Sequence, residues 1–206
     1  MTHGIEDERV ALIGRRVKAE LRKRMRGVRG ALPASATAER SGKIVRALEA
    51  LECVAEARAV ALFWPITDKR EVDLRALDAS LRARGAKVAY PSIDPETRAM
   101  CMRFVDDTAT LEERGLGFEE PPYDAPAAAR GDLDAIVVPC LAVDPRGHRI
   151  GYGAGYYDRT LPLYAPPALT VAVGYAFQLV MEVPASPDDV PVDWIVTDEG
   201  AARAAR

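Results

Sequence analysis

The first part of the chain has a helical pattern of hydrophobic positions. Over residues 5–30, apolar side chains recur at three-, four- and five-residue steps, with Lys and Arg between them. This spacing predicts an amphipathic helix, which Pro33 ends. Ser35 is a suitable cap for a second helix that runs to about residue 57. A third helix is expected over residues 73–84 because Leu recurs there at helical steps.

Short apolar runs alternate with helical segments in the rest of the chain. Runs of this length, stopped by Pro or Gly, are typical of buried strands. They predict strands at residues 59–64, 87–90, 100–105, 134–139, 169–175 and 194–197. A further helix is expected at residues 155–164. This alternation predicts one α/β domain over residues 1–206, with a mostly parallel, Rossmann-like sheet flanked by helices.

Two segments lack a clear pattern. Residues 106–133 are rich in Gly and Pro. They are expected to cross the surface as a long excursion, with one short helix near residues 124–130. Residues 201–206 are expected to form a frayed tail.

Composition and charge restrict the possible partners. Hydrophobic residues make up 49% and charged residues 29%, as in an ordinary globular protein. The net charge of -3 argues against nucleic-acid binding by the chain as a whole. Between Arg9 and Arg29 there are nine Lys or Arg and one acid, a helix suited to phosphate groups or simply a solvated basic face. No aromatic residue lies there for base stacking, which argues against RNA binding.

The chain has neither an 18-residue apolar run nor an uncharged leader among its first 30 residues. We therefore expect no membrane segment and a cytoplasmic location with reduced thiols. The three cysteines, Cys53, Cys101 and Cys140, are expected to be small packing residues. A monomer is expected.

The strongest chemical signal is a glycine-rich segment after the strand at residues 134–139. Gly151, Gly153 and Gly155 alternate with other residues just before a predicted helix. Glycines let backbone N–H groups approach a ligand, and a helix N-terminus favours phosphate. The spacing is neither that of a dinucleotide fingerprint nor that of a P-loop. A tight turn with a stacked tyrosine pair is the structural alternative.

The segment from Asp134 to Leu161 resembles the signature of the 5-formyltetrahydrofolate cyclo-ligase family. That signature has an apolar strand, Pro, a short apolar stretch, Asp, a Gly turn and then Arg-x-Gly-x-Gly-x-Gly-Tyr-Tyr-Asp. Other blocks agree in order, namely Phe63 to Ile66 with Glu71, Tyr90-Pro91, Gly115 to Pro121, and Gln178 to Thr197. The resemblance covers about residues 15–200. It implies the NagB/RpiA/CoA transferase-like fold.

The resemblance also implies an ATP site. In the family the glycine-rich loop binds ATP, which places around the phosphates Arg149, Ile150, Gly151, Tyr152, Gly153, Ala154, Gly155, Tyr156 and Tyr157. Lys18 matches a cation of the N-terminal helix. The second cation position of that helix is Gly14 here, so the neighbouring Arg15 is the expected substitute. Tyr152 replaces an Arg found in many relatives.

Metal and folate residues follow in the same way. Asp158 and Asp189 match the acids that hold Mg²⁺, with Asp188 as an alternative to the latter. Glu71 corresponds to the acid that contacts the reduced folate. Trp64 and Tyr156 can offer flat walls to the pterin ring, although packing is the alternative for Trp64.

The implied reaction is the ATP- and Mg²⁺-dependent cyclisation of 5-formyltetrahydrofolate to 5,10-methenyltetrahydrofolate. It would pass through a phosphorylated imidate and release ADP and phosphate. Phosphoryl transfer depends on positioning and charge neutralisation, which agrees with the lack of a convincing nucleophilic triad. The alternative is a non-catalytic folate- or nucleotide-binding relative with a regulatory role, and Gly14 and Tyr152 favour it.

Overall fold

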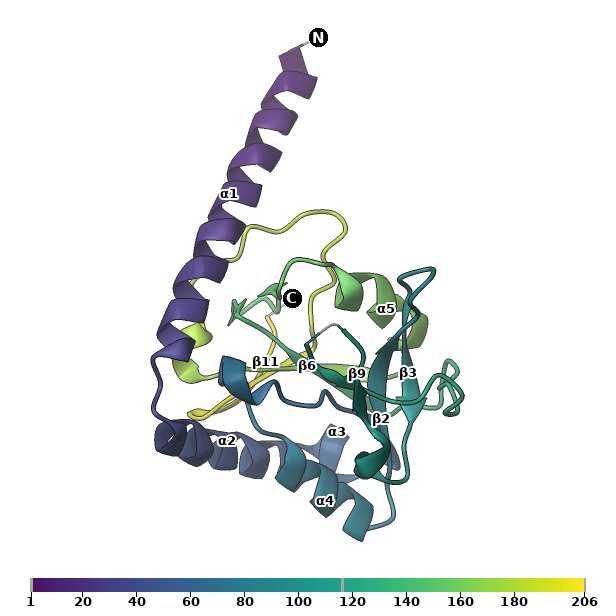
Figure 1. The fold of residues 1–206 in the computed structure, drawn as a ribbon. Coiled ribbons are helices and arrows are strands. Elements are labelled where there is room, and N and C mark those ends of the chain that lie inside the picture. The colour runs from purple at the N-terminus through teal and green to yellow at the C-terminus, as the bar shows by residue number, and fades with distance from the viewer. Residues whose placement is uncertain (1, 116, 206) are drawn as a thin grey trace.

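The centre of the computed structural model is a mixed sheet of seven strands (Figure 1). The structure describes residues 2–115 and 117–205. The strands follow the order β11-β10-β9-β6-β1-β2-β3. Their bounds are β1 Ala59–Ala61, β2 Lys87–Ile93, β3 Met100–Phe104, β6 Ala135–Pro139, β9 Leu169–Val173, β10 Trp194–Thr197 and β11 Gly200–Arg203.

The five inner strands pair in parallel, whereas β3 and β11 pair antiparallel at the two edges. This arrangement confirms the predicted α/β class with a mostly parallel sheet. The helices are α1 Thr2–Gly30, α2 Ala34–Glu49, α3 Glu52–Ala55, α4 Arg75–Ala83 and α5 Tyr156–Tyr164.

Helices cover both faces of the sheet, and each face has its own hydrophobic core. On one face, α2 and α4 pack through Ile44, Leu48 and Leu77 (Figure 1). On the other face, α5 packs through Leu161 and Tyr164. The β6 strand serves both cores because successive side chains of a strand point to opposite faces. A strand buried in this way is apolar throughout, which explains why its sequence signal is strong.

The order of the parallel strands creates a switch point between β1 and β6. From β1 the chain crosses to β2 on one side, and from β6 it crosses to β9 on the other side. Ligands of open α/β sheets bind beside the carboxyl ends of the strands at this point. The segments that follow β1 and β6 are therefore the ones to inspect for a site.

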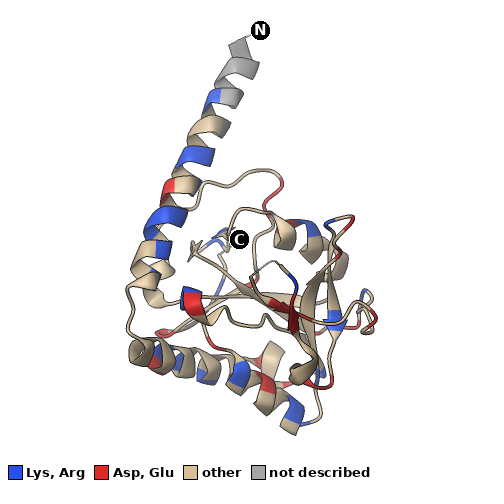
Figure 2. Cartoon of the chain, viewed as in Figure 1, with Lys and Arg blue, Asp and Glu red and all other residues tan. Residues whose placement is uncertain are grey.

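The basic helix α1 extends well beyond the rest of the molecule (Figures 1 and 2). Its second half packs through Leu21 and Met25 against a small hairpin of β7 (Ala142–Val143) and β8 (Arg149–Ile150). In its first half, Val10 and Ile13 are exposed. Within the described residues, no helix is long and apolar enough to cross a membrane.

Several predicted boundaries were wrong. The helix expected up to residue 57 is divided into α2 and α3, and Ser35 lies inside α2, where Pro33 precedes the first turn without a side-chain cap. The strand expected over residues 59–64 ends at Ala61. The strand β2 continues through Pro91, which pairs with Met102 of β3. Proline is tolerated there because β1 pairs with β2 only as far as Ala89.

Two predictions about the irregular segments were also wrong. Residues 124–130 form turns and a bridge of Ala127 to Arg103 instead of a helix. The preceding excursion contains a hairpin of β4 (Glu112–Glu113) and β5 (Glu119–Glu120). The frayed tail expected over residues 201–206 begins inside β11, whose four residues all pair with β10. Pairing covers one edge of the sheet and therefore orders this segment.

Candidate functional site

A cavity of about 430 Å³ opens at the switch point of the sheet. The segment after β1 and the carboxyl ends of β2 and β6 line it, together with α1, the glycine-rich loop and the first turn of α5. The lining residues are Lys18, Arg22, Phe63, Trp64, Ile66, Lys69, Glu71, Pro91, Ile93, Met100, Phe118, Pro139, Arg149, Gly151, Tyr152, Gly153, Ala154, Gly155, Tyr156, Tyr157, Asp158 and Asp189. The lining thus combines cationic, acidic and apolar side chains.

The glycine-rich loop is held in place by α1. Arg22 Nε donates to the carbonyl oxygen of Gly151 at 3.1 Å, and Arg26 Nη2 donates to that of Tyr152 at 3.3 Å. Gly153 has a φ of +106°, which side chains with a Cβ rarely adopt. A Cβ on Gly153 would also lie 3.4 Å from the guanidinium carbon of Arg22. Glycine at this position therefore permits both the turn and the close approach of α1.

Asp158 and Arg149 form a linked pair at one end of the cavity. Arg149 Nη2 donates to Asp158 Oδ1 at 2.9 Å, and Arg149 Nη1 donates to the carbonyl oxygen of Val190 at 2.5 Å. The Arg149 side chain is 4% exposed and that of Asp158 is 28% exposed. Arg149 thus anchors Asp158, whose carboxylate still reaches the cavity surface.

Asp189 pairs with Lys18 across the opening. Lys18 Nζ donates to Asp189 Oδ2, which also accepts from the backbone N–H of Ser186 at 2.7 Å. Partial burial would raise the pKa of the Asp189 carboxyl, but the hydrogen bonds from Lys18 and Ser186 outweigh it and lower the pKa. The carboxylate therefore remains charged at neutral pH.

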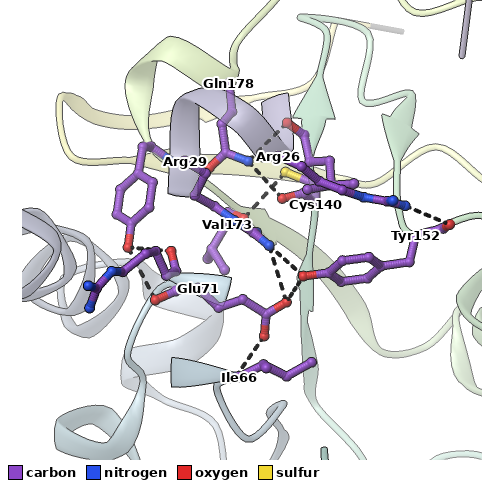
Figure 3. Close-up of polar contacts among 11 residues, drawn as sticks. Arg26, Arg29, Ile66, Glu71, Cys140, Tyr152, Val173 and Gln178 are labelled. Carbon is purple, nitrogen blue, oxygen red and sulfur yellow. Dashed lines mark hydrogen bonds and ion pairs between the residues drawn. The ribbon is translucent and has the colours of Figure 1, made fainter. Parts of the chain in front are cut away.

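Glu71 lies at the centre of a buried polar network (Figure 3). Glu71 Oε2 accepts from the backbone N–H of Ile66 at 2.9 Å, and Oε1 accepts from the hydroxyl of Tyr152 at 2.5 Å. Arg29 donates to the same hydroxyl, and its Nη2 lies 3.7 Å from Glu71 Oε1. An ionised carboxylate has about four acceptor positions, so Glu71 can still accept from a ligand.

Aromatic side chains line the other part of the cavity. Trp64 packs edge-on against Tyr90, with ring centroids 5.9 Å apart. Tyr156 begins α5 and lies beside the cations of Arg98 and Arg159. These rings and the apolar floor suit a flat heterocycle more than a second charged group.

Most of the predicted site residues meet in this cavity, but three do not line it. Arg15 is exposed, one turn nearer the projecting end of α1 than Lys18. Ile150 is 1% exposed and packs against Leu141 in the core beneath α1. Asp188 is exposed, so of the two neighbouring acids it is Asp189 that faces the cavity.

Sequence reasoning missed three cations at the site. Arg22 and Lys69 line the cavity, and Arg29 reaches the Glu71 network. The signal was available for α1, because Lys18, Arg22 and Arg29 recur at steps of four and seven residues and so share one helix face. Lys69 follows Trp64 in a short 3-10 turn, η1 (Thr67–Lys69), for which the sequence has no comparable signal.

The donor set fits Mg²⁺ only if a ligand supplies more oxygen atoms. No group of three or more Asp, Glu, His or Cys among the described residues could hold a metal ion. However, Asp158 and Asp189 line the same cavity. Mg²⁺ is commonly held by one or two carboxylates together with water and substrate phosphates. The two acids are therefore compatible with Mg²⁺ that arrives with a nucleotide.

A glycine-rich loop at the switch point of a parallel sheet defines an α/β protein that binds small ligands. The profile of the 5-formyltetrahydrofolate cyclo-ligase family matches residues 15–198. The 5-formyltetrahydrofolate cyclo-ligase of Escherichia coli K12 is 31% identical over 149 residues, or 70% of this chain and 80% of that protein. That of Mycolicibacterium smegmatis is 36% identical over 136 residues, or 64% and 70%.

Solved structures agree with these matches. The 5,10-methenyltetrahydrofolate synthetase of Aquifex aeolicus superposes with a TM-score of 0.80 at 32% identity, and covers 92% of this chain and 94% of its own. The synthetase of Mycoplasma pneumoniae, at 24% identity and a TM-score of 0.71, shares the fold. The chain belongs to the 5-formyltetrahydrofolate cyclo-ligase family.

Proposed function

We propose that this chain uses ATP to cyclise 5-formyltetrahydrofolate to 5,10-methenyltetrahydrofolate, with release of ADP and phosphate. The observation that carries the proposal is the single cavity shared by the glycine-rich loop, Lys18 and Asp158 on one side and by Trp64 and Glu71 on the other. Two ligands that react with each other must meet in one site. All of these residues belong to one chain, so a monomer suffices.

The cationic side of the cavity is the proposed place for the ATP phosphates. Gly151, Gly153 and Gly155 leave the loop backbone open to a ligand, and α5 begins directly after them. Lys18 and Arg22 face the same space from α1. Together they offer backbone N–H groups and charge-assisted donors to an anion.

The apolar side of the cavity is the proposed place for the folate. Trp64, Ile93 and Phe118 offer apolar surface to the pterin, and Glu71 lines the same cavity. The aminopyrimidinone of a pterin presents adjacent N–H donors, which a carboxylate accepts well. Glu71 accepts hydrogen bonds from Ile66 and Tyr152 and lies close to Arg29, so its carboxylate is directed by residues of this chain.

The proposed chemistry requires no nucleophilic side chain. The N5-formyl oxygen takes the γ-phosphoryl group of ATP, which leaves ADP and a phosphorylated imidate. N10 then attacks the activated carbon and loses its proton, and the former formyl oxygen departs in phosphate. The protein contributes position and positive charge from Lys18 and Arg22.

Mg²⁺ is the proposed cofactor, held by Asp158 and Asp189 together with phosphate oxygens. When bound, it would neutralise part of the phosphate charge. The Arg149 guanidinium orients Asp158, and the N–H of Ser186 orients Asp189. Lys18 forms an ion pair with Asp189, so a nucleotide phosphate at this place would compete with Asp189 for the lysine.

The competing function is a non-catalytic folate- or nucleotide-binding relative. Tyr152 favours it, because a tyrosine stands in the loop where a cation would help to hold phosphate. Lys69 compensates in part, since its ammonium group lies 4.9 Å from the centre of the Tyr152 ring and faces the same cavity.

A spectroscopic assay for the methenyl product distinguishes the two functions. The purified chain is mixed with 5-formyltetrahydrofolate and Mg²⁺, with ATP, without nucleotide, or with a non-hydrolysable ATP analogue. We expect product and ADP in equal amounts with ATP only. Binding of both ligands without product would favour the non-catalytic relative, and binding of neither would contradict both functions.

A further inference from the structure

Tyr152 is the one residue of the glycine-rich loop whose side chain reaches across to the Glu71 network (Figure 3). Its backbone lies between Gly151 and Gly153, and its carbonyl oxygen accepts from Arg26 at 3.3 Å. Its hydroxyl donates to Glu71 at 2.5 Å and accepts from Arg29. The main chain of Tyr152 is therefore part of the glycine-rich loop, while its side chain is part of the Glu71 network.

The Tyr152 hydroxyl forms a hydrogen-bonded bridge between Arg29 and Glu71. Arg29 and Glu71 side chains are 4% and 3% exposed, yet their nearest charged atoms are 3.7 Å apart. The Tyr152 oxygen lies within hydrogen-bond distance of both. Burial and the Glu71 charge raise the pKa of the Tyr152 hydroxyl, so it keeps the proton that it donates to Glu71.

The ring of Tyr152 is also held by cations from two elements. Arg26 and Arg29 of α1 lie 5.5 and 5.7 Å from the ring centre, and Lys69 of η1 lies 4.9 Å from it. The same turn carries Ile66 at its start, whose N–H binds Glu71. A displacement of Glu71 or η1 would therefore act on Tyr152 directly.

We infer that Tyr152 is a positioning residue that couples the two ligand sites, so that folate held at Glu71 and ATP held at the loop each strengthen the binding of the other. The inference rests on the proposed function. A ligand on Glu71 adds a contact to the carboxylate that accepts from the Tyr152 hydroxyl, and Tyr152 lies in the loop between Gly151 and Gly153.

The physical reason is the entropy of the loop. Ordering a backbone residue costs roughly 1–2 kcal/mol, and glycine costs the most. When the first ligand has already ordered the loop, the second ligand does not meet this cost again. Binding coupled in this way is reciprocal and typically changes affinity by about 5- to 150-fold.

Calorimetric titration of the full-length chain measures the coupling. 5-Formyltetrahydrofolate is titrated with and without a saturating non-hydrolysable ATP analogue and Mg²⁺, and the analogue is then titrated with and without folate. We expect each ligand to lower the Kd of the other by the same factor, about tenfold. The readout is this ratio, which a purely structural role of Tyr152 would leave unchanged.

Tyr152→Phe removes the hydroxyl alone and should reduce the ratio to below about twofold, whichever way the separate affinities move. Tyr123→Phe is the matched control, because Tyr123 is exposed, packs under Arg114 and does not line the cavity. It should keep the full ratio.

Two results would overturn the coupling while the proposed function stands: a wild-type chain that forms methenyl product but has a ratio near one, or a Tyr152→Phe variant that keeps the wild-type ratio. The first needs no variant and so does not depend on how the substitution folds. A wild-type chain that binds neither ligand would remove the proposed function and the coupling together.

Discussion

At the scale of single residues, the site depends on backbone positions that only glycine satisfies well. Gly153 combines a φ of +106° with the guanidinium of Arg22 at contact distance. The sequence predicted the glycine-rich loop and its place before α5. It could not predict the contact with Arg22, because that contact joins residues 131 positions apart whose meeting depends on the packing of α1.

Gly153→Ala should weaken ATP binding by about tenfold or more, because a side chain at a φ of +106° is strained and the loop would move to relieve that strain. The positive φ should also lower the free energy of unfolding by about 1–2 kcal/mol. Calorimetric ATP titration and thermal unfolding measure the two effects separately.

Gly131→Ala is the control for backbone strain. Gly131 has a φ of +91°, and nothing lies within 4 Å of an added Cβ. It should lose stability like Gly153→Ala but keep its ATP affinity. Equal losses of ATP affinity in the two variants would show that strain, and not the site, is responsible.

The two neighbouring acids near the C-terminus provide a second test. Asp189→Asn should raise the Mg²⁺ concentration that supports half-maximal turnover, because a charge is lost where the nucleotide and metal are proposed to bind. Asp188→Asn should leave that concentration unchanged, since Asp188 is exposed and does not line the cavity. A Mg²⁺ titration of both variants decides between the acids, and the reverse result would move the metal site to Asp188.

At the scale of elements, strong patterns predicted strands and helices well, while pairing between elements was invisible. The apolar run of β6 and the Leu spacing of α4 follow from their own residues. The residues of β11 were predicted to belong to a frayed tail, because their order comes from pairing with β10 and not from a pattern of their own. Each strand of the β7–β8 and β4–β5 hairpins is only two residues long, which is too short to show an alternation of apolar and polar positions.

The β4–β5 hairpin contains a buried acid with an incomplete set of partners. Glu120 Oε1 accepts from the N–H of Ile93 at 2.8 Å, whereas Oε2 is buried without a hydrogen-bond partner among the described residues. Burial raises the pKa of Glu120 above its ordinary value of 4.5. The folded state therefore prefers the protonated acid, and the contribution of Glu120 to stability is lost as pH rises through its folded pKa.

Glu120→Gln should thus increase the free energy of unfolding more at pH 7.5 than at pH 4. The substitution removes a buried charge that is already neutralised by protonation at the lower pH. Thermal unfolding at both pH values measures the change, and each kcal/mol corresponds to about 2–4 °C in a chain of this size. Glu119→Gln, at an exposed neighbour, should have no pH-dependent effect. An equal change in unfolding temperature for Glu120→Gln at both pH values would contradict the raised pKa of Glu120.

At the scale of the whole molecule, the fold brings four distant segments to one edge of the sheet. Lys18, Glu71, the glycine-rich loop and Asp189 all line one cavity. The predicted strand ends were enough to expect Glu71 and the glycine-rich loop at one edge of the sheet. Lys18 and Asp189 were expected there only from the family resemblance. The presence of Arg22 in the cavity lining depends on how α1 lies across the loop, and this required the structure.

The two sides should respond separately to substitution. Glu71→Gln keeps the size of the side chain but loses its charge. Because a charged hydrogen bond contributes roughly 1.5–3 kcal/mol, affinity for 5-formyltetrahydrofolate alone should fall about tenfold or more. Lys18→Ala should instead lower the affinity for ATP alone. Lys23→Ala, an exposed cation of the same helix, controls for a general loss of positive charge.

The most direct test is therefore a calorimetric comparison of both ligands, each titrated alone, against Glu71→Gln and Lys18→Ala. The account predicts a crossed pattern, in which Glu71→Gln loses folate affinity and keeps ATP affinity while Lys18→Ala does the opposite. If Glu71→Gln lowered only the affinity for ATP, or changed the affinity for neither ligand, the cavity would not be a shared folate and ATP site.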